Sequence, residues 1–264
     1  MASYDLIGSR ETGAVAIVEL AEGEDPEEVA REIMRRHKHV KSVLLKAGPR
    51  YGVERLRPLI LVAGSSNTEV IHREYGMRLK LDPRLVYFSP REAEDRQEVA
   101  SMVRPGERVL VMFAGVGPYA IAIARKREDV RVVGVEINPA AVRYFRENVR
   151  LNKVEDRVKV IQGDVRDVCP RLGPSFDRVL MPLPLGAYQY LRLGLSCIRP
   201  EGGFLHFYYF GGEGAVEEGV SLAKREAYAL GLSTRLVGWR RVGSFAPRAW
   251  KFRIDLEISQ LISP

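Results

Sequence analysis

Short apolar runs alternate with amphipathic runs from Gly106 onward, and this alternation restricts the fold more than any other feature of the chain. The apolar runs are rich in β-branched residues and are bounded by glycines and polar residues, as is typical of strands. Strands that alternate with helices predict a mostly parallel sheet with right-handed crossovers. We expect the parallel strands at residues 107–113, 130–136, 158–164, 176–181 and 202–210.

Two more strand-like runs, at 233–242 and 249–258, follow without a helix between them and predict an antiparallel hairpin at one edge. The expected fold class is therefore α/β, with a Rossmann-like, mostly parallel sheet and a small N-terminal α+β domain. We expect three parts: the small domain at residues 1–75, a linker and helix at 76–105, and the Rossmann-like domain at 106–264.

The charge of the chain favours a nucleic-acid partner. The net charge is +7, with 41 Lys and Arg residues against 34 Asp and Glu. Arginine predominates, and its planar fork suits phosphate. Asn and Gln are few beside the high charge, which indicates a thermophile.

Several classes of protein are not favoured. Cys169 and Cys197 offer neither a disulfide framework nor metal-ligand spacing, and the four histidines are scattered. We see no signal-peptide pattern and no apolar run of membrane-spanning length. We therefore expect a cytoplasmic protein without a metal, a membrane partner or an obligate protein partner.

A glycine turn follows the first parallel strand, in the stretch FAGVGP from Phe113 to Pro118. Gly115 and Gly117 let the backbone turn sharply and let a ligand approach it closely. The helix that follows offers unpaired N–H groups, and ligands of open α/β sheets bind outside the carboxyl ends of strands. A tight turn without a ligand remains the alternative. The full G-x-G-x-x-G spacing of dinucleotide-binding proteins is missing.

The ends of the next three strands add polar groups in a suitable order. Glu136, close to 20 residues after the glycines, suits a ribose diol, or alternatively pairs with a helix dipole. Asp164 could accept from an adenine amino group, or be a turn residue. Ile137 and Val165 follow these carboxylates directly and are expected to lie beside the same cofactor. The stretch LMPLP, with Pro182 and Pro184, offers a rigid rim for a flat purine, or alternatively a stiffened loop.

The motifs FSPR, FAGVGP, EINP, DVRD, MPLP and GGFLHFYY occur in one order, and with them the chain resembles the archaeal and eukaryotic tRNA (guanine-37 N1)-methyltransferases. The resemblance spans about residues 1–260. It implies a class I methyltransferase fold, S-adenosylmethionine (SAM) as cofactor, and the tRNA anticodon stem-loop as partner, with the base 3′ of the anticodon as target. It also implies that the extra N-terminal domain, which touches the tRNA elbow in many members, is absent.

A sister family transfers the aminocarboxypropyl group of the same cofactor to a wyosine precursor in tRNA. Its acidic motif matches EINP here, but it usually has MGYV where this chain has MPLP. The resemblance therefore favours methyl transfer and leaves the other transfer as an alternative. A second alternative is a tRNA-binding module without catalysis.

The resemblance also implies catalytic residues in the linker helix. Guanine N1 must lose a proton, and a carboxylate is its natural acceptor. The family has Glu four residues after the Arg of FSPR, whereas this chain has the shorter Asp95, with Glu94 in reserve. A solvated acidic helix face is the other interpretation of these carboxylates.

The remaining site residues follow from the same resemblance. Arg55, with Arg57 beside it, matches the family's arginine that stabilises O6, although it could simply be a surface arginine. Arg96 matches a position near the cofactor, Arg91 is expected to meet the RNA, and Pro184 is placed with the substrate. Two positions depart from the family: Val111 replaces an Asp, and Pro182 replaces the Asn of many members.

Overall fold

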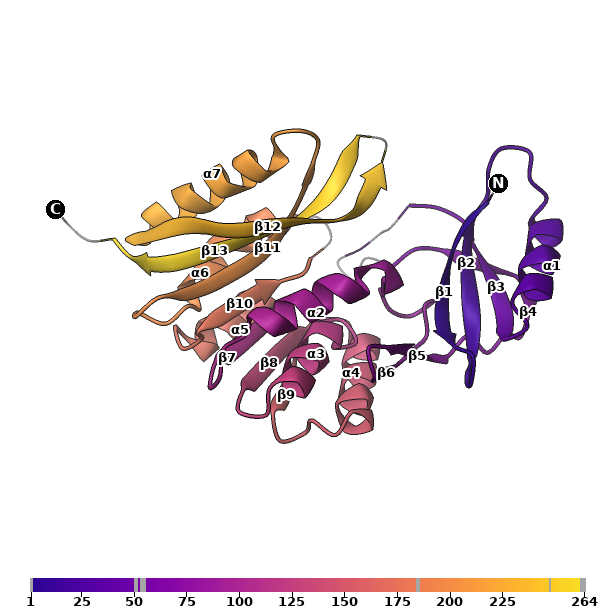
Figure 1. Ribbon diagram of the computed structural model, residues 1–264, viewed down its shortest axis with the longest axis horizontal. Helices are drawn as coiled ribbons and strands as arrows, with labels where there is room; N and C mark the ends of the chain where they lie inside the picture. Colours follow the sequence, from indigo (N-terminus) through magenta and orange to yellow (C-terminus); the bar gives the residue numbers. More distant parts are fainter. Residues whose placement is uncertain (1, 50–51, 53–55, 184–185, 247, 262–264) are drawn as a thin grey trace.

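The central element is a seven-stranded sheet that runs through the second and larger part of the chain (Figure 1). The structure, a computed structural model, describes residues 2–49, 52, 56–183, 186–246 and 248–261. The strand order is β12-β13-β11-β10-β7-β8-β9. Its members are β7 (Arg108–Met112), β8 (Arg131–Glu136), β9 (Val158–Gln162), β10 (Arg178–Met181), β11 (Gly203–Gly211), β12 (Leu232–Ala246) and β13 (Ala249–Gln260).

The pairing confirms the expected fold class. Strands β7 to β11 pair in parallel, whereas β13 is antiparallel to both of its neighbours, β11 and β12. The long β12–β13 hairpin therefore forms the antiparallel edge that the two strand-like runs predict. The register pairs Met181, the last residue of β10, with Phe207, so that β11 extends beyond the end of β10.

Helices cover both faces of this sheet because successive side chains of its strands point to opposite sides. In β7, Val109 and Val111 belong to one buried cluster, while Leu110 and Met112 belong to another. The first cluster lies under α2 (Ala93–Met102), α3 (Pro118–Lys126) and α4 (Pro139–Leu151). The second lies under α5 (Val165–Leu172), α6 (Leu191–Ser196) and α7 (Ala215–Tyr228).

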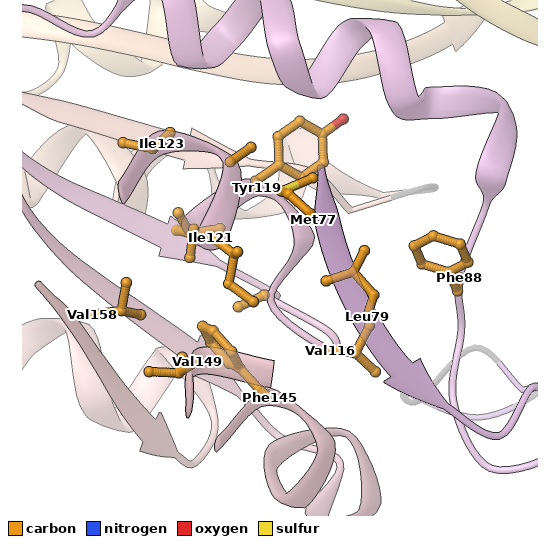
Figure 2. Close-up of a cluster of buried hydrophobic side chains, with 14 of the residues drawn as sticks. Met77, Leu79, Phe88, Val116, Tyr119, Ile121, Ile123, Phe145, Val149 and Val158 are labelled. Atoms are coloured by element: carbon orange, nitrogen blue, oxygen red, sulfur yellow. The ribbon is translucent and has the colours of Figure 1, made fainter. Parts of the chain in front are cut away.

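One ring in the first cluster explains two of the glycines (Figure 2). Phe145 of α4 is fully buried. A Cβ atom on Gly117 would lie 2.0 Å from Cδ2 of this ring, and one on Gly134 of β8 would lie 2.4 Å from its Cε1. Gly117 also has φ +88°, a backbone conformation that favours glycine. The packing of α4 against β8 and against the glycine turn therefore requires both glycines.

The N-terminal part is a four-stranded sheet of order β1-β2-β3-β4, with α1 (Pro26–Arg36) on its outer face (Figure 1). Its strands are β1 (Ser3–Ser9), β2 (Gly13–Glu19), β3 (Val40–Lys46) and β4 (Leu59–Gly64). The helix begins with residue types that favour a helix start: Pro26 is its first residue, and Asp25 accepts from the backbone N–H of Glu28 at 2.8 Å.

A two-stranded hairpin of β5 (Val70–Glu74) and β6 (Met77–Leu81) lies between the two sheets. Its outer edge is closed by α4, where Asn148 and Asn152 are one helical turn apart. Asn148 accepts from Lys80 N at 2.6 Å and donates to Lys80 O at 3.0 Å, and Asn152 makes the same pair of bonds with Arg78. The hairpin spans both sides of the domain boundary predicted at residue 75, which stays a prediction.

The structure adds elements that the sequence analysis does not expect. Helix α5 begins after its N-cap Asp164 and contains Pro170. Because proline is disfavoured inside helices, the sequence does not predict a helix here. The segment between β10 and β11 forms, over its described residues, a 3₁₀ turn, η2 (Ala187–Tyr190), followed by the short α6 in place of one long helix. None of the described helices is both long enough and apolar enough to cross a membrane.

Candidate functional site

A pocket opens at the carboxyl edge of the seven-stranded sheet, where β7, β8 and β9 end. The expected cofactor residues Phe113, Ile137, Asp164 and Val165 line it. The other lining residues come from β8, the end of β9 and α5 (Val135, Gly163, Arg166), from the segment after β10 (Leu183, Gly186, Gln189, Tyr190), and from the N-terminal part of the chain (Gly52). Ligands of open α/β sheets bind at this edge, so the pocket is the candidate cofactor site.

Glu136, the last residue of β8, is held by backbone N–H groups on both of its carboxylate oxygens. Gly115 of the glycine turn donates to Oε2 at 2.7 Å, and Asn138 donates to Oε1 at 2.8 Å. The side chain is 8% exposed. These two hydrogen bonds fix the orientation of the Glu136 carboxylate at the end of β8.

Asp164 caps α5 at the pocket wall. It accepts from Arg166 N at 2.8 Å and from the Arg166 guanidinium at 2.6 Å. The hydrogen bond from the Arg166 side chain lowers the pKa of Asp164, so the residue is a stable acceptor at neutral pH.

Phe113 has an unusual backbone at the end of β7. Its φ is +56°, which non-glycine residues rarely adopt. The ring meets that of Tyr190 edge to face, with 5.0 Å between centroids. Such strained residues cluster at functional sites, and here the strain turns an aromatic ring into the pocket wall.

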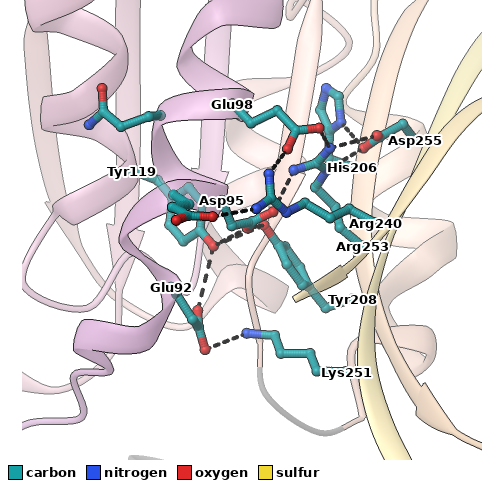
Figure 3. A network of polar contacts seen from close by, with 12 residues as sticks. Glu92, Asp95, Glu98, Tyr119, His206, Tyr208, Arg240, Lys251, Arg253 and Asp255 are labelled. Carbon is teal, nitrogen blue, oxygen red and sulfur yellow. Dashed lines mark hydrogen bonds and ion pairs between the residues drawn. The ribbon is translucent and has the colours of Figure 1, made fainter. Parts of the chain in front are cut away.

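The expected proton acceptor, Asp95 on α2, lies in a buried polar network (Figure 3). It is 2% exposed and is not among the described residues that line the cofactor pocket. Its Oδ2 accepts from Tyr119 at 2.7 Å and from Tyr208 at 2.5 Å, and its Oδ1 pairs with Arg253. Burial raises the pKa of each tyrosine well above its ordinary value, so both remain neutral donors.

The network continues along β13 away from the pocket. Arg253 also donates to Asp255, which pairs with His206 Nδ1 at 2.6 Å. The other ring nitrogen of His206 lies 2.5 Å from Arg178 Nη1, so it has to accept. Burial, above all, lowers the pKa of His206, which agrees with a neutral ring between Asp255 and Arg178.

Toward the carboxyl edge, the network ends in a second carboxylate. Glu92, at the end of the turn η1 (Pro90–Glu92), accepts from Lys251 Nζ at 2.8 Å. Glu94 points elsewhere and pairs with Arg240 at 2.8 Å. Of these two glutamates close to Asp95 in sequence, Glu92 is thus the buried one, 9% exposed.

Several of the other expected residues lie outside the lining of the cofactor pocket. Arg96 is buried and makes a two-pronged ion pair with Glu74 of β5, with both distances 2.6 Å, so it ties α2 to the hairpin. Arg91 pairs with Asp5 of β1 at 2.5 Å. Pro182 follows β10 directly and is not a lining residue of the pocket. The expected residues Arg55 and Pro184 lie outside the described residues.

The partners of Asp95 could not be recognised from the sequence alone. His206 and the aromatic run 207–210 look like core, and Tyr208 is indeed buried, but its hydroxyl faces a carboxylate. In β13, Lys251, Arg253 and Asp255 alternate with apolar residues, a pattern that indicates one polar face. That pattern does not say that α2 covers the face.

Comparisons with known proteins find a family and relatives that are similar in sequence and in fold. A family model described as the TRM5/TYW2 methyltransferase domain matches residues 70–233. A Pyrococcus abyssi protein named tRNA (guanine(37)-N(1))-methyltransferase Trm5b is 41% identical over 97% of this chain and 75% of its own length.

Two solved structures are similar as well. One, described as the complex of aTrm5 and tRNALeu, has a TM-score of 0.83 and 30% identity over 97% of this chain and 71% of that one. The other, Methanocaldococcus jannaschii TYW2 in complex with AdoMet, has a TM-score of 0.74 and 25% identity over 98% of this chain and all of that one.

Proposed function

The chain belongs to the TRM5/TYW2 methyltransferase family, and from this premise we propose that it methylates N1 of guanosine 37 in tRNA. It is a methyltransferase with SAM as its cofactor. The main support for the target base is the 41% identity, over nearly the whole chain, to a relative named for this activity. The net charge of +7 agrees with an RNA substrate.

The residues at the carboxyl edge fit this cofactor, which supplies the methyl group when bound. Glu136 is proposed to hold the ribose hydroxyls with its carboxylate, which Gly115 and Asn138 orient. Asp164 offers an acceptor for the adenine amino group. Apolar walls from Phe113, Ile137 and Val165 suit the flat base.

Four more residues complete the proposed cofactor site. Gly115, Gly117 and Pro182 would act through their backbone, since none of them has a polar side chain. Arg96 would act indirectly: it donates to Ser89 O at 3.1 Å and so fixes the segment that leads into α2.

We propose Asp95 as the acceptor of the guanine N1 proton and Arg55 as the donor to O6. Asp95 reaches Tyr208, which follows the register partner of Met181, so the carboxylate lies level with the end of β10. Three donors already hold Asp95, so it would receive the proton either through a tyrosine hydroxyl or after one donor has moved away. Arg91 and Pro184 are proposed to contact the RNA.

Mass spectrometry of nucleosides tests the proposal. The protein is incubated with SAM and an unmodified tRNA transcript, and the expected product is 1-methylguanosine 3′ of the anticodon, heavier than guanosine by about 14 Da. A tRNA with the wyosine precursor is run in parallel. An addition of about 101 Da there, without methylguanosine on the transcript, would establish the aminocarboxypropyl alternative instead.

A further inference from the structure

A second pocket lies between the N-terminal sheet and the segment that leads into α2. Arg57, Lys46 and Asp5 line it from the side of the sheet, and Tyr87, Phe88 and Pro90 line it from the other side. It shares no described lining residue with the cofactor pocket. A ligand held here would therefore be distinct from the cofactor.

Arg57, a lining residue of this pocket, has an unused hydrogen-bond donor. Its Nε atom is buried and has no hydrogen-bond partner among the described residues. Buried polar side-chain atoms in native proteins nearly always have a partner, so an orphaned guanidinium N–H indicates a missing ligand.

The charges around the pocket favour an anion. Lys46 pairs with Glu19 at 2.8 Å, and Arg91 pairs with Asp5 at 2.5 Å. The hydrogen bond and charge of Lys46 lower the pKa of Glu19, and the charges of Arg57 and Arg91 add to this effect, so all three cations lie within reach of one carboxylate. Arg57 has no ion pair with any described residue, and the cluster keeps one positive charge in excess.

We propose that Arg57 binds a phosphodiester group of the substrate tRNA at this pocket. The inference rests on the proposed function, since it takes tRNA as the source of the anion. A guanidinium fork binds two phosphate oxygens at once, and Nε is one of the donors such a fork uses. The pocket lies beside the FSPR segment, so the phosphate would be one close to the target base.

The salt dependence of tRNA binding tests the site. Removal of one phosphate-binding arginine lowers the slope of log Kd against log salt concentration by about 1, and weakens binding about tenfold near 0.1 M salt. We expect both changes for Arg57→Met. The matched control is Arg235→Met, because Arg235 is exposed, paired with Glu257, and near the opposite, amino edge of the sheet. An Arg57→Met slope equal to that of Arg235→Met would overturn the site.

A second variant covers the case in which Arg57→Met does not fold. Arg57→Lys keeps the charge and loses the fork, so it should retain the salt slope and still weaken binding several-fold; wild-type affinity would contradict the site. Formation of 1-methylguanosine is measured on the same wild-type samples. Its absence would contradict the proposed function alone, whereas an unchanged salt slope for Arg57→Met would contradict the phosphate site alone.

Discussion

The ring of Phe145 is clamped between two glycines, and the substitution Gly134→Ala should therefore destabilise the protein by a steric effect alone. The added Cβ atom would lie 2.4 Å from Cε1 and 2.7 Å from Cζ of the ring. The backbone of Gly117 also lies against this ring, since a Cβ atom on Gly117 would be 2.0 Å from Cδ2, and this limits how far the ring can move away. Overpacking of this kind lowers the free energy of unfolding by about 1–3 kcal/mol.

Thermal unfolding measures the effect. For a chain of this size, 1 kcal/mol corresponds to roughly 2–4 °C in Tm, so we expect a decrease of roughly 2–12 °C. Gly243→Ala is the matched control, because its Cβ atom would meet nothing within 4 Å and its φ is not in the left-handed region. It should change Tm by no more than about 1 °C.

A double-mutant cycle with Phe145→Leu separates the clash from other causes. The smaller side chain relieves the contact, so the double variant should be more stable than the sum of the single effects by about 1 kcal/mol. Additive effects, or a Gly134→Ala variant as stable as Gly243→Ala, would refute the reasoning.

Three further predictions concern the site and its network. Asp95→Asn should lower turnover by about 10²–10⁴-fold with SAM affinity nearly unchanged, and unaltered turnover would remove Asp95 as the proton acceptor. Glu136→Ala should weaken SAM binding, measured by calorimetry, and leave tRNA affinity as it is; equal SAM affinity would contradict the ribose assignment. The lowered pKa of His206 means that the unfolded chain binds this proton first, so stability should fall as the pH drops below about 6.5. For His206→Gln, the free energy of unfolding, measured with guanidinium at several pH values, should therefore depend less on pH in this range. The same pH dependence as in the wild type would mean that other groups cause the loss of stability.

The sequence predicts the parallel sheet and the ends of its strands well, because both depend on local patterns. Strand, glycine turn and helix follow one another directly, and Glu136 meets Gly115 as expected from two adjacent strand ends. Asn138 likewise caps its helix, accepting from Ala140 N at 2.9 Å. In these cases neighbours in sequence, or in adjacent parallel strands, decide the contact.

The surroundings of Asp95 could not be predicted in the same way. Arg253 lies 158 residues away and reaches Asp95 only because α2 packs over β13. The ion pair of Arg96 with Glu74 depends on where the hairpin lies. The left-handed backbone of Phe113 has no sequence signal, since glycine would be the expected residue there. Long-range packing and strain thus decide the features that a pattern along the chain does not contain.

The hairpin β5–β6 has a mechanical consequence. It joins the N-terminal sheet at Gly8, whose N–H donates to His72, and joins α4 through Asn148 and Asn152. One buried cluster runs from Ile7 through the hairpin into α3 and α4. The N-terminal lobe, built on the four-stranded sheet, and the second lobe, built on the seven-stranded sheet, should accordingly tumble in solution as a single rigid body with one rotational correlation time. An RNA bound by the N-terminal lobe is then already oriented toward the seven-stranded lobe. Little entropy is lost in aligning the two lobes before the reaction.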